Sequence, residues 1–346
     1  MSLGKALRTL GARVVFLTND DPVVCRYVSA AGFQVEPINL GRPWTSEDVE
    51  RLLETAARHD STIAIVDSDE DGADYLGGIR KAGIFTVAID DVASHPFPCH
   101  LVVNGDAHAT QLRYESTSGD TVFLLGPRYA ILREEFWTLT PPALRAQVQE
   151  VLVTVGGADP LGLTPRIIST LDQVPGQFTV SVIVGPFFEN EAEIEGSART
   201  SQRRVGLVRS PQSVASRFLR SDLAISAAGQ TLYELACAGC PTVALAAASN
   251  QVQQLQMLGE AGVVVSLGPA ESDDLMSRLS SACAALIEDP AARARMRRAG
   301  RGLIDGVGAL RVARGILSAA YGGRCDAERT SCVVGAPLMN SEEESR

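Results

Sequence analysis

Small and amide-bearing residues occupy a point where a short apolar run gives way to a helical pattern. Leu223–Ser226 has the composition of a buried strand, and the helical pattern begins at Leu232. Small residues between the two let a phosphate approach the backbone, where free N–H groups and the helix dipole supply positive potential. The turn is therefore a candidate anion site, formed by Ser226, Ala228, Gly229, Gln230 and Thr231.

Glu234 lies one turn into this helix and has two interpretations. Its carboxylate could accept hydrogen bonds from a diol such as that of ribose. Alternatively, Thr231 and Glu234 make the S/T-x-x-E pattern of a capping box, which would only close the helix end. The residues themselves leave both interpretations open.

Two other loops have a similar character. Gly156 and Gly157 follow the strand-like run Val151–Val155, and paired glycines permit close approach of a ligand to the backbone. Asn250 and Gln251 stand between another predicted strand and helix, where an amide can cap the helix, contact a ligand, or both. The glycine pair is not G-x-G-x-x-G, so it gives no support for a dinucleotide cofactor, and we expect no cofactor.

Asp159 and Pro160 predict the next helix start, because Asp is a common N-cap and Pro a common first helical residue. Three helix starts that follow strands in one lobe are expected to converge on one anion. This convergence would let a chain with a net charge of −10 hold an anionic ligand without many lysines. The same acidic charge argues against a nucleic-acid partner.

Three side chains are candidates for a general base. Asp67 ends a predicted strand, and His95 and His108 lie in loops that follow strands. Asp67 also opens an acidic run that begins like a calcium loop, but Gly78 stands where that loop needs a bidentate Glu. The four histidines have no metal-ligand spacing, so we expect no metal.

Strand and helix patterns alternate along the chain in two stretches. Such alternation predicts an α/β protein with parallel sheets and helices on both faces. Pro141 and Pro142 mark a lobe boundary. We therefore expect two Rossmann-like lobes, 1–138 and 139–321, with a ligand cleft between them at the carboxyl ends of the strands, and a disordered tail at 322–346.

The start of the chain lacks a feature of this fold. The sequence opens on a helical pattern with no strand before it, although the first strand of a doubly wound sheet is normally central. Without that strand, two neighbouring strands would have unpaired backbone groups. We expect that the first strand is missing and that the recorded start lies downstream of the natural one.

Composition places the protein in a reducing compartment. Seven cysteines without framework spacing indicate reduced thiols, and no apolar run approaches the roughly 20 residues needed to span a bilayer. Cys237 and Cys240 form a lone C-x-x-C at the end of a predicted helix, where packing explains them. We expect a cytoplasmic protein without an integral membrane segment; the oligomeric state is left open.

Four stretches resemble the UDP-sugar hydrolases of the pseudaminic-acid pathway and their spore-coat polysaccharide relatives of the SpsG type. They also resemble the C-terminal lobe of MurG-like glycosyltransferases with the GT-B fold. The stretches are Leu125–Phe136, Gly156–Pro160, Ser226–Glu234 and Asp305–Val312. The resemblance covers the chain up to about residue 320, and the first stretch is the most specific to the hydrolases.

The resemblance implies an enzyme that hydrolyses a UDP-linked diacetamido deoxy sugar at the anomeric carbon without a metal. It adds Arg128 and Tyr129 to the expected substrate contacts. It also implies a catalytic histidine in a loop after the first strand, just ahead of this chain, so we expect UDP binding with little turnover. The alternatives are a GT-B glycosyltransferase that uses a UDP-sugar donor, and an inactive nucleotide-sugar binder if Met1 is the true start.

Overall fold

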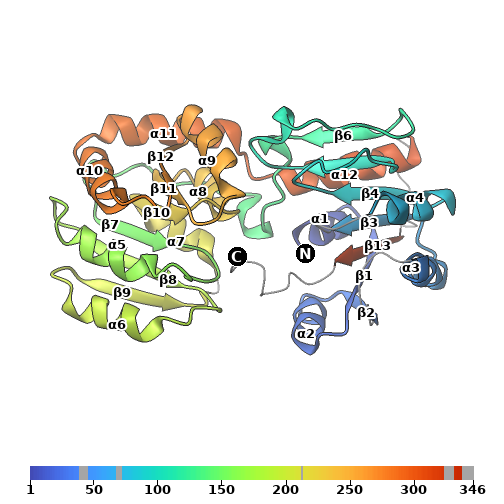
Figure 1. Ribbon diagram of the computed structural model, residues 1–346, viewed down its shortest axis with the longest axis horizontal. Helices are drawn as coiled ribbons and strands as arrows, with labels where there is room; N and C mark the ends of the chain where they lie inside the picture. The colour runs from blue at the N-terminus through green and yellow to red at the C-terminus, as the bar shows by residue number, and fades with distance from the viewer. Residues whose placement is uncertain (39–45, 68–71, 212, 323–330, 337–346) are drawn as a thin grey trace. The chain divides into compact units, whose positions relative to one another are not determined.

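The computed structural model describes residues 1–38, 46–67, 72–211, 213–322 and 331–336 of the 346-residue chain (Figure 1). The chain forms two compact units, each built on its own parallel sheet. Unit 1 contains Met1–Glu134 and the segment that starts at Val307, and unit 2 contains Glu135–Gly306. The expected α/β class with two parallel-sheet lobes is confirmed.

Unit 1 has a seven-stranded sheet in the order β2-β1-β13-β3-β4-β5-β6. Its strands are β1 (Arg13–Asn19), β2 (Gln34–Ile38), β3 (Ile63–Asp67), β4 (Phe85–Ile89), β5 (Leu101–Asn104), β6 (Val122–Leu125) and β13 (Ser331–Ala336). Its helices are α1 (Ser2–Thr9), α2 (Pro22–Ala30), α3 (Ser46–Arg58), α4 (Ala73–Lys81) and α12 (Gly308–Tyr321), with short 3-10 turns η1 (Ala109–Gln111) and η2 (Pro127–Tyr129).

A strand from the C-terminal part of the sequence, β13, lies inside this sheet. β13 lies between β1 and β3 and pairs with both in parallel, as its dark red arrow shows in Figure 1. Val333 is fully buried, and the Ser331 hydroxyl lies 2.8 Å from the Ser61 hydroxyl. The sheet therefore has no gap where the first strand was expected to be missing. Residues 331–336 also correct the expectation of a disordered tail; the remainder of that tail beyond Gly322 lies outside the described residues.

Helix α12 was expected in the second lobe, within 139–321, and the structure groups it with unit 1. Three contacts explain this correction. Gly308 lies so close to Ala130 that a Cβ there would overlap the Ala130 carbonyl oxygen. The Arg311 guanidinium donates to the Arg128 carbonyl, and the Tyr321 hydroxyl lies 2.6 Å from Thr62 Oγ1. The division between units falls at Glu134, close to the boundary that the two prolines indicated.

Unit 2 has a six-stranded parallel sheet in the order β12-β11-β10-β7-β8-β9. Its strands are β7 (Glu150–Thr154), β8 (Thr179–Val184), β9 (Val205–Arg209), β10 (Leu223–Ala227), β11 (Thr242–Ala246) and β12 (Val264–Pro269). Its helices are α5 (Leu163–Leu171), α6 (Glu191–Thr200), α7 (Val214–Arg220), α8 (Thr231–Ala238), α9 (Gln251–Glu260), α10 (Leu275–Glu288) and α11 (Pro290–Leu303).

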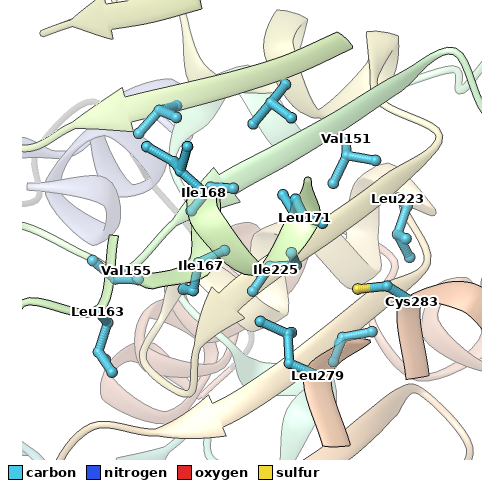
Figure 2. Close-up of a cluster of buried hydrophobic side chains, with 14 of the residues drawn as sticks. Val151, Val155, Leu163, Ile167, Ile168, Leu171, Leu223, Ile225, Leu279 and Cys283 are labelled. Carbon is cyan, nitrogen blue, oxygen red and sulfur yellow. The ribbon is translucent and has the colours of Figure 1, made fainter. Parts of the chain in front are cut away.

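An apolar core fixes one face of this sheet. Figure 2 shows side chains of α5, among them Ile167 and Leu171, near Val151 of β7 and Ile225 of β10, together with Leu279 of α10; all are buried. Burial of this many aliphatic side chains is the main stabilising contribution to the unit. Packing against this core fixes the positions of the strands, and with them the points at which the loops leave their carboxyl ends.

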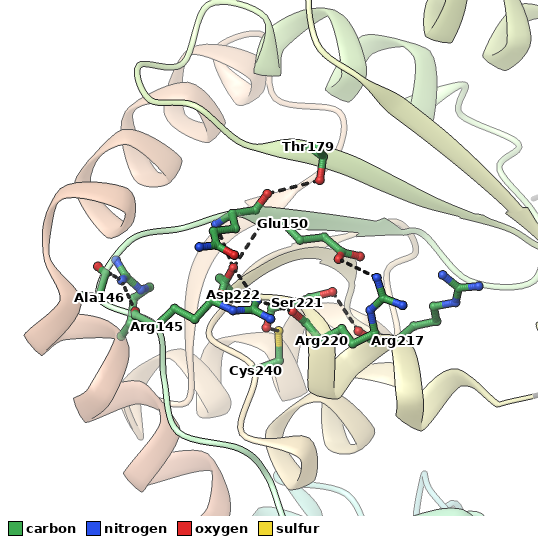
Figure 3. Close-up of polar contacts among 11 residues, drawn as sticks. Arg145, Ala146, Glu150, Thr179, Arg217, Arg220, Ser221, Asp222 and Cys240 are labelled. Carbon is green, nitrogen blue, oxygen red and sulfur yellow. Dashed lines mark hydrogen bonds and ion pairs between the residues drawn. The ribbon is translucent and has the colours of Figure 1, made fainter.

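The amino ends of the same strands carry a polar cluster with a structural role (Figure 3). Asp222 accepts hydrogen bonds from the amides of Gln149 and Glu150 at 2.8 and 3.1 Å, and from Arg145 at 3.1 Å. Arg293 of α11 is fully buried and donates to the carbonyls of Arg145 and Ala146. Arg293 therefore holds the segment before β7 against α11. Among the described residues, no helix is long and apolar enough to cross a bilayer.

Candidate functional site

Three loops of unit 2 meet at one edge of its sheet. β10 pairs in parallel with both β7 and β11, with Ser226 opposite Thr154 and Ala227 opposite Leu245. The carboxyl ends of the three strands therefore lie side by side. The loops that leave them contain Gly156–Gly157, Gly229–Gln230 and Asn250, as the sequence indicated.

The loop after β10 presents backbone donors without a side-chain cap. Helix α8 begins at Thr231, and its N-cap residue Gln230 makes no side-chain cap bond. Thr231 is therefore the first helical residue and not the N-cap, which removes the capping-box interpretation. Within the described residues, the structure gives no hydrogen bond from the backbone amides of Gly229, Gln230 and Thr231. These donors and the helix dipole favour an anion at this turn.

The loop after β11 also lacks a side-chain cap, although the amides of Gln251 and Val252 donate to the carbonyls of Ala248 and Ser249 at 3.1 and 3.2 Å. Helix α9 begins at Gln251, and the N-cap residue Asn250 is exposed and makes no side-chain cap bond. Gln251 turns its side-chain oxygen back to accept from the Ala247 amide at 2.9 Å, which fixes the loop. No acidic residue lies in the first turn of α9. The start of α9 is therefore an uncharged surface next to the start of α8.

The loop after β7 differs from the expectation. Asp159 is buried, and its carboxylate accepts from the amides of Leu163 and Thr164 at 2.8 Å each. Helix α5 consequently begins at Leu163, not at Pro160. The start of α5 already holds a carboxylate, so two helix starts converge where three were expected. Gly156 has a φ of +110°, which favours glycine, and its contact with a ligand stays a prediction.

The other helices that start at this edge are capped or carry acidic side chains; the start of α7 is closed by Ser213, whose hydroxyl accepts from the Ser216 amide at 3.1 Å and donates to Glu135 at 2.6 Å. Helix α6 has Glu191 and Glu193 in its first turn, and the N-cap of α10 is Asp274. In α8 the acidic residue of the first turn is Glu234, which is only 3% exposed. Among the described helix starts of unit 2 at this edge, α8 and α9 therefore offer amides without an exposed carboxylate. This selects one region of the edge for an anionic group.

Two predicted contact residues at the carboxyl end of β10, Ser226 and Ala228, are fully buried. The Ser226 hydroxyl donates to the Ala227 carbonyl at 2.9 Å. Neither side chain faces solvent, so contact of these two residues with a ligand through the backbone stays a prediction. Gly157, Gly229, Gln230, Thr231 and Asn250 remain at least partly exposed.

A residue that the sequence did not reveal connects the two helix starts. Gln254 of α9 is buried, its amide group donates to the Ala228 carbonyl, and its oxygen accepts from the Tyr233 hydroxyl at 3.0 Å. It therefore fixes the α8 turn to α9. Its position one turn after the half-buried Gln251 offered a signal, since an amide on the buried face of a helix needs polar partners.

Replacing Gln254 with Leu is expected to lower the free energy of unfolding by about 1–3 kcal/mol, because a buried carbonyl and a buried hydroxyl lose their partner. The measurement is urea denaturation. Gln256→Leu, on an exposed position of the same helix, is the matched control and should leave stability nearly unchanged. Equal stability of wild type and Gln254→Leu would contradict the bridging role.

Comparisons with known proteins agree with this architecture. The chain is 23% identical to the uncharacterized protein MJ1062 of Methanocaldococcus jannaschii over 256 residues, 71% of this chain and 51% of that protein. It is 25% identical to the spore coat polysaccharide biosynthesis protein SpsG of Bacillus subtilis over 200 residues, 56% of this chain and 58% of SpsG. The chain thus spans little more than half the length of either relative. No family model matches it.

Solved structures decide the fold. MurG of Acinetobacter baumannii superposes with a TM-score of 0.68 at 14% identity, over 91% of this chain and 93% of MurG. The chain has the GT-B fold. The calicheamicin glycosyltransferase CalG4 superposes with a TM-score of 0.61 at 16% identity, over 94% of each chain. The resemblance to SpsG and to MurG-like enzymes is therefore confirmed, SpsG by sequence and MurG by fold.

The stretch Leu125–Phe136 has a packing role in this GT-B chain. In unit 1 the Arg128 carbonyl accepts from Arg311, and the Arg128 guanidinium lies 5.4 Å from the centre of the Tyr129 ring. In unit 2 a Cβ on Gly306 would overlap the Phe136 carbonyl oxygen. Two of the four resembling stretches thus pack on each other. Substrate contact by the Arg128 and Tyr129 side chains stays a prediction.

The candidate bases lie in unit 1. Asp67 ends β3 and is exposed, whereas residues 68–71 that follow it lie outside the described residues. His95 has its Nδ1 atom 3.1 Å from the Pro96 carbonyl and its ring 4.8 Å from that of Phe97. His108 is buried, and its Nδ1 atom has no hydrogen-bond partner within the described residues.

Thiol and metal chemistry have no support in the described part of the chain. Cys237 and Cys240 are free and buried, and Cys237 lies in the last turn of α8. Burial raises the pKa of the Cys237 thiol to about 11. A thiol with such a pKa is protonated at neutral pH and is a poor nucleophile or metal ligand. The described residues contain no group of three or more His, Cys, Asp or Glu side chains that could hold a metal ion.

Proposed function

We propose that the chain is a nucleotide-sugar enzyme whose unit 2 holds the diphosphate of a UDP-linked acetamido deoxy sugar at the starts of α8 and α9. Its proposed reaction is hydrolysis at the anomeric carbon, in the biosynthesis of a nonulosonic acid or a surface polysaccharide. One observation carries the proposal. The start of α8 presents the amides of Gly229, Gln230 and Thr231 without a side-chain cap, the neighbouring start of α9 has no acidic residue in its first turn, and the start of α5 beside them is closed by Asp159.

The polar residues around these turns suit the other parts of such a ligand. The exposed Asn250 and the fixed amide of Gln251 offer donors and acceptors for sugar hydroxyl or acetamido groups. Glu234 is the proposed ribose contact, because it is the acidic residue of the first turn of α8. Its burial means that ribose hydroxyls would reach only the edge of the carboxylate.

The proposed reaction needs a base and a stabilised leaving group. Water attacks the anomeric carbon while a base takes its proton, and the bond between that carbon and the β-phosphate oxygen breaks. The negative charge that develops on the diphosphate is stabilised by the amides and dipoles of α8 and α9. The candidate bases remain those that the sequence indicated, namely Asp67, His95 and His108.

A glycosyltransferase is the second candidate function. The solved structures with this fold include the glycosyltransferase CalG4. A transferase would bind the same donor, and an acceptor hydroxyl would replace water as the nucleophile. The SpsG relative, a spore coat polysaccharide biosynthesis protein, is compatible with either reaction.

The purified chain is expected to bind UDP, and EDTA is expected to leave the affinity unchanged, because backbone amides take the place of a cation. Isothermal titration calorimetry with and without EDTA measures this. UDP release from UDP-N-acetyl sugars in the absence of an acceptor supports hydrolysis, whereas release only with an added acceptor supports the transferase. Binding without release in either assay identifies a binder, and absence of UDP binding contradicts the proposed site.

A further inference from the structure

The largest exposed apolar side chain of unit 2 stands at the edge that carries the proposed site. Phe187 is 73% exposed, and it lies in the loop that follows β8. Its neighbour Phe188 is buried in the core of the unit. An isolated exposed phenylalanine costs hydrophobic free energy unless something covers it. Its place next to the site suggests that the cover is a ligand.

The loop after β8, which contains Phe187, is hydrogen-bonded to the Gly156–Gly157 turn after β7. The Phe187 amide donates to the Gly157 carbonyl at 3.0 Å. Gly185 sits so close to this turn that a Cβ would overlap the Gly157 carbonyl oxygen. A Cβ on Gly157 would in turn lie 3.7 Å from the Phe187 ring. The aromatic ring is therefore held beside a turn whose residues carry no side chains.

We infer that Phe187 is the stacking surface for the nucleobase of the nucleotide sugar; this inference rests on the proposed function. β8 and β10 are both neighbours of β7, so their loops are separated by two strand spacings, about 10 Å. This separation matches the reach from the diphosphate to the base in a nucleoside diphosphate. With the diphosphate at α8, the base reaches the loop after β8.

Charge determines which end of the ligand lies at Phe187. Glu193 is exposed at the start of α6 directly after the Phe187 loop and disfavours a phosphate there, whereas Glu191 is paired with Arg209 at 2.9 Å; a neutral base is tolerated. On the opposite side of α8, Asn250 and Gln251 provide amides that suit a hydroxyl-rich sugar. The ligand is thus oriented with the base toward β8 and the sugar toward β11.

Calorimetric titration of UDP and of inorganic pyrophosphate into four proteins tests the inference. These are wild type, Phe187→Ala, Phe187→Leu and Phe187→Tyr. Loss of base stacking should raise the Kd for UDP about tenfold or more in the Ala and Leu variants. The Tyr variant should bind UDP like wild type, because it keeps the aromatic face. Pyrophosphate has no base, so its Kd should be the same in all four proteins.

Any other outcome contradicts either the proposed function or the stacking role of Phe187. If wild type does not bind UDP, the proposed function fails. If wild type binds UDP and the Ala and Leu variants bind equally well, the stacking role alone fails. If UDP and pyrophosphate both weaken, Phe187 supports the Gly157 turn and does not contact the base. If sedimentation shows a wild-type dimer that Phe187→Ala dissociates, a second copy covers the ring. Equal Tm values confirm that the variants are folded, as expected for a side chain this exposed.

Discussion

The substitution Val333→Asp is expected to unfold unit 1 while unit 2 keeps its structure. Val333 is 0% exposed in β13, whose two neighbours β1 and β3 hold it in the centre of the sheet. An unpaired carboxylate buried there costs several kcal/mol. That cost is a large share of the roughly 5–15 kcal/mol by which folded proteins are stable. Hydrogen exchange should show lost amide protection in β1 and β3 and retained protection in β7 and β10.

The matched control for this experiment is Val122→Asp. It introduces the same side chain into the same sheet, but Val122 is 45% exposed in the edge strand β6. Amide protection in the Val122→Asp variant should stay close to that of wild type, because surface substitutions change stability by about 0.5 kcal/mol or less. Retained protection of β1 and β3 in the Val333→Asp variant would show that β13 does not complete the sheet.

The substitution Gly229→Asp is expected to weaken UDP binding at least 100-fold while the protein becomes no less stable. A Cβ at Gly229 has no atom within 4 Å, and its φ does not require glycine, so the side chain is accommodated. The new carboxylate would occupy the amides at the start of α8, as Asp159 does for α5. A helix gains stability from such a cap, whereas the diphosphate loses hydrogen bonds of about 1.5–3 kcal/mol each.

Gly229→Asn is the matched control, because it has the same size and can also cap but is neutral. Its UDP affinity should fall between those of wild type and Gly229→Asp. Affinity and Tm should therefore change in opposite directions for the Asp variant, which a general loss of folding cannot produce. Unchanged UDP affinity in Gly229→Asp would place the diphosphate away from α8. Ala228 is a poorer site for this test, since it is fully buried and a charge there would disturb the core.

The strands and helices that recur as β-α pairs were predictable because each has a complete local signal. The loop after β10 is an example: a buried apolar run, a turn of small residues and a helical pattern follow in order, and the structure has β10 and α8 there. The details of the helix starts were less predictable. Asp159 was expected to cap the helix at Pro160, but its carboxylate reaches the amides of Leu163 and Thr164, and the helix starts later.

β13 had too weak a local signal. Cys332, Val333 and Val334 are the apolar residues of a short run within a polar tail, and such a run is ambiguous by periodicity. The strand forms because β1 and β3 both offer unpaired backbone groups to it, a tertiary effect that no local window contains. The strand that completes the sheet of unit 1 is β13, which follows unit 2 in the sequence.

The position of β13 also sets the order in which the two units can fold during synthesis. Arg13 of β1 pairs with Ser331, so the sheet of unit 1 stays incomplete until nearly the whole chain has left the ribosome. All six strands of unit 2 lie within Glu135–Gly306, and unit 2 can close its sheet first. The usual N-terminal-first order is thus inverted. Until β13 arrives, β1 and β3 have exposed strand edges, and nascent unit 1 is open to aggregation.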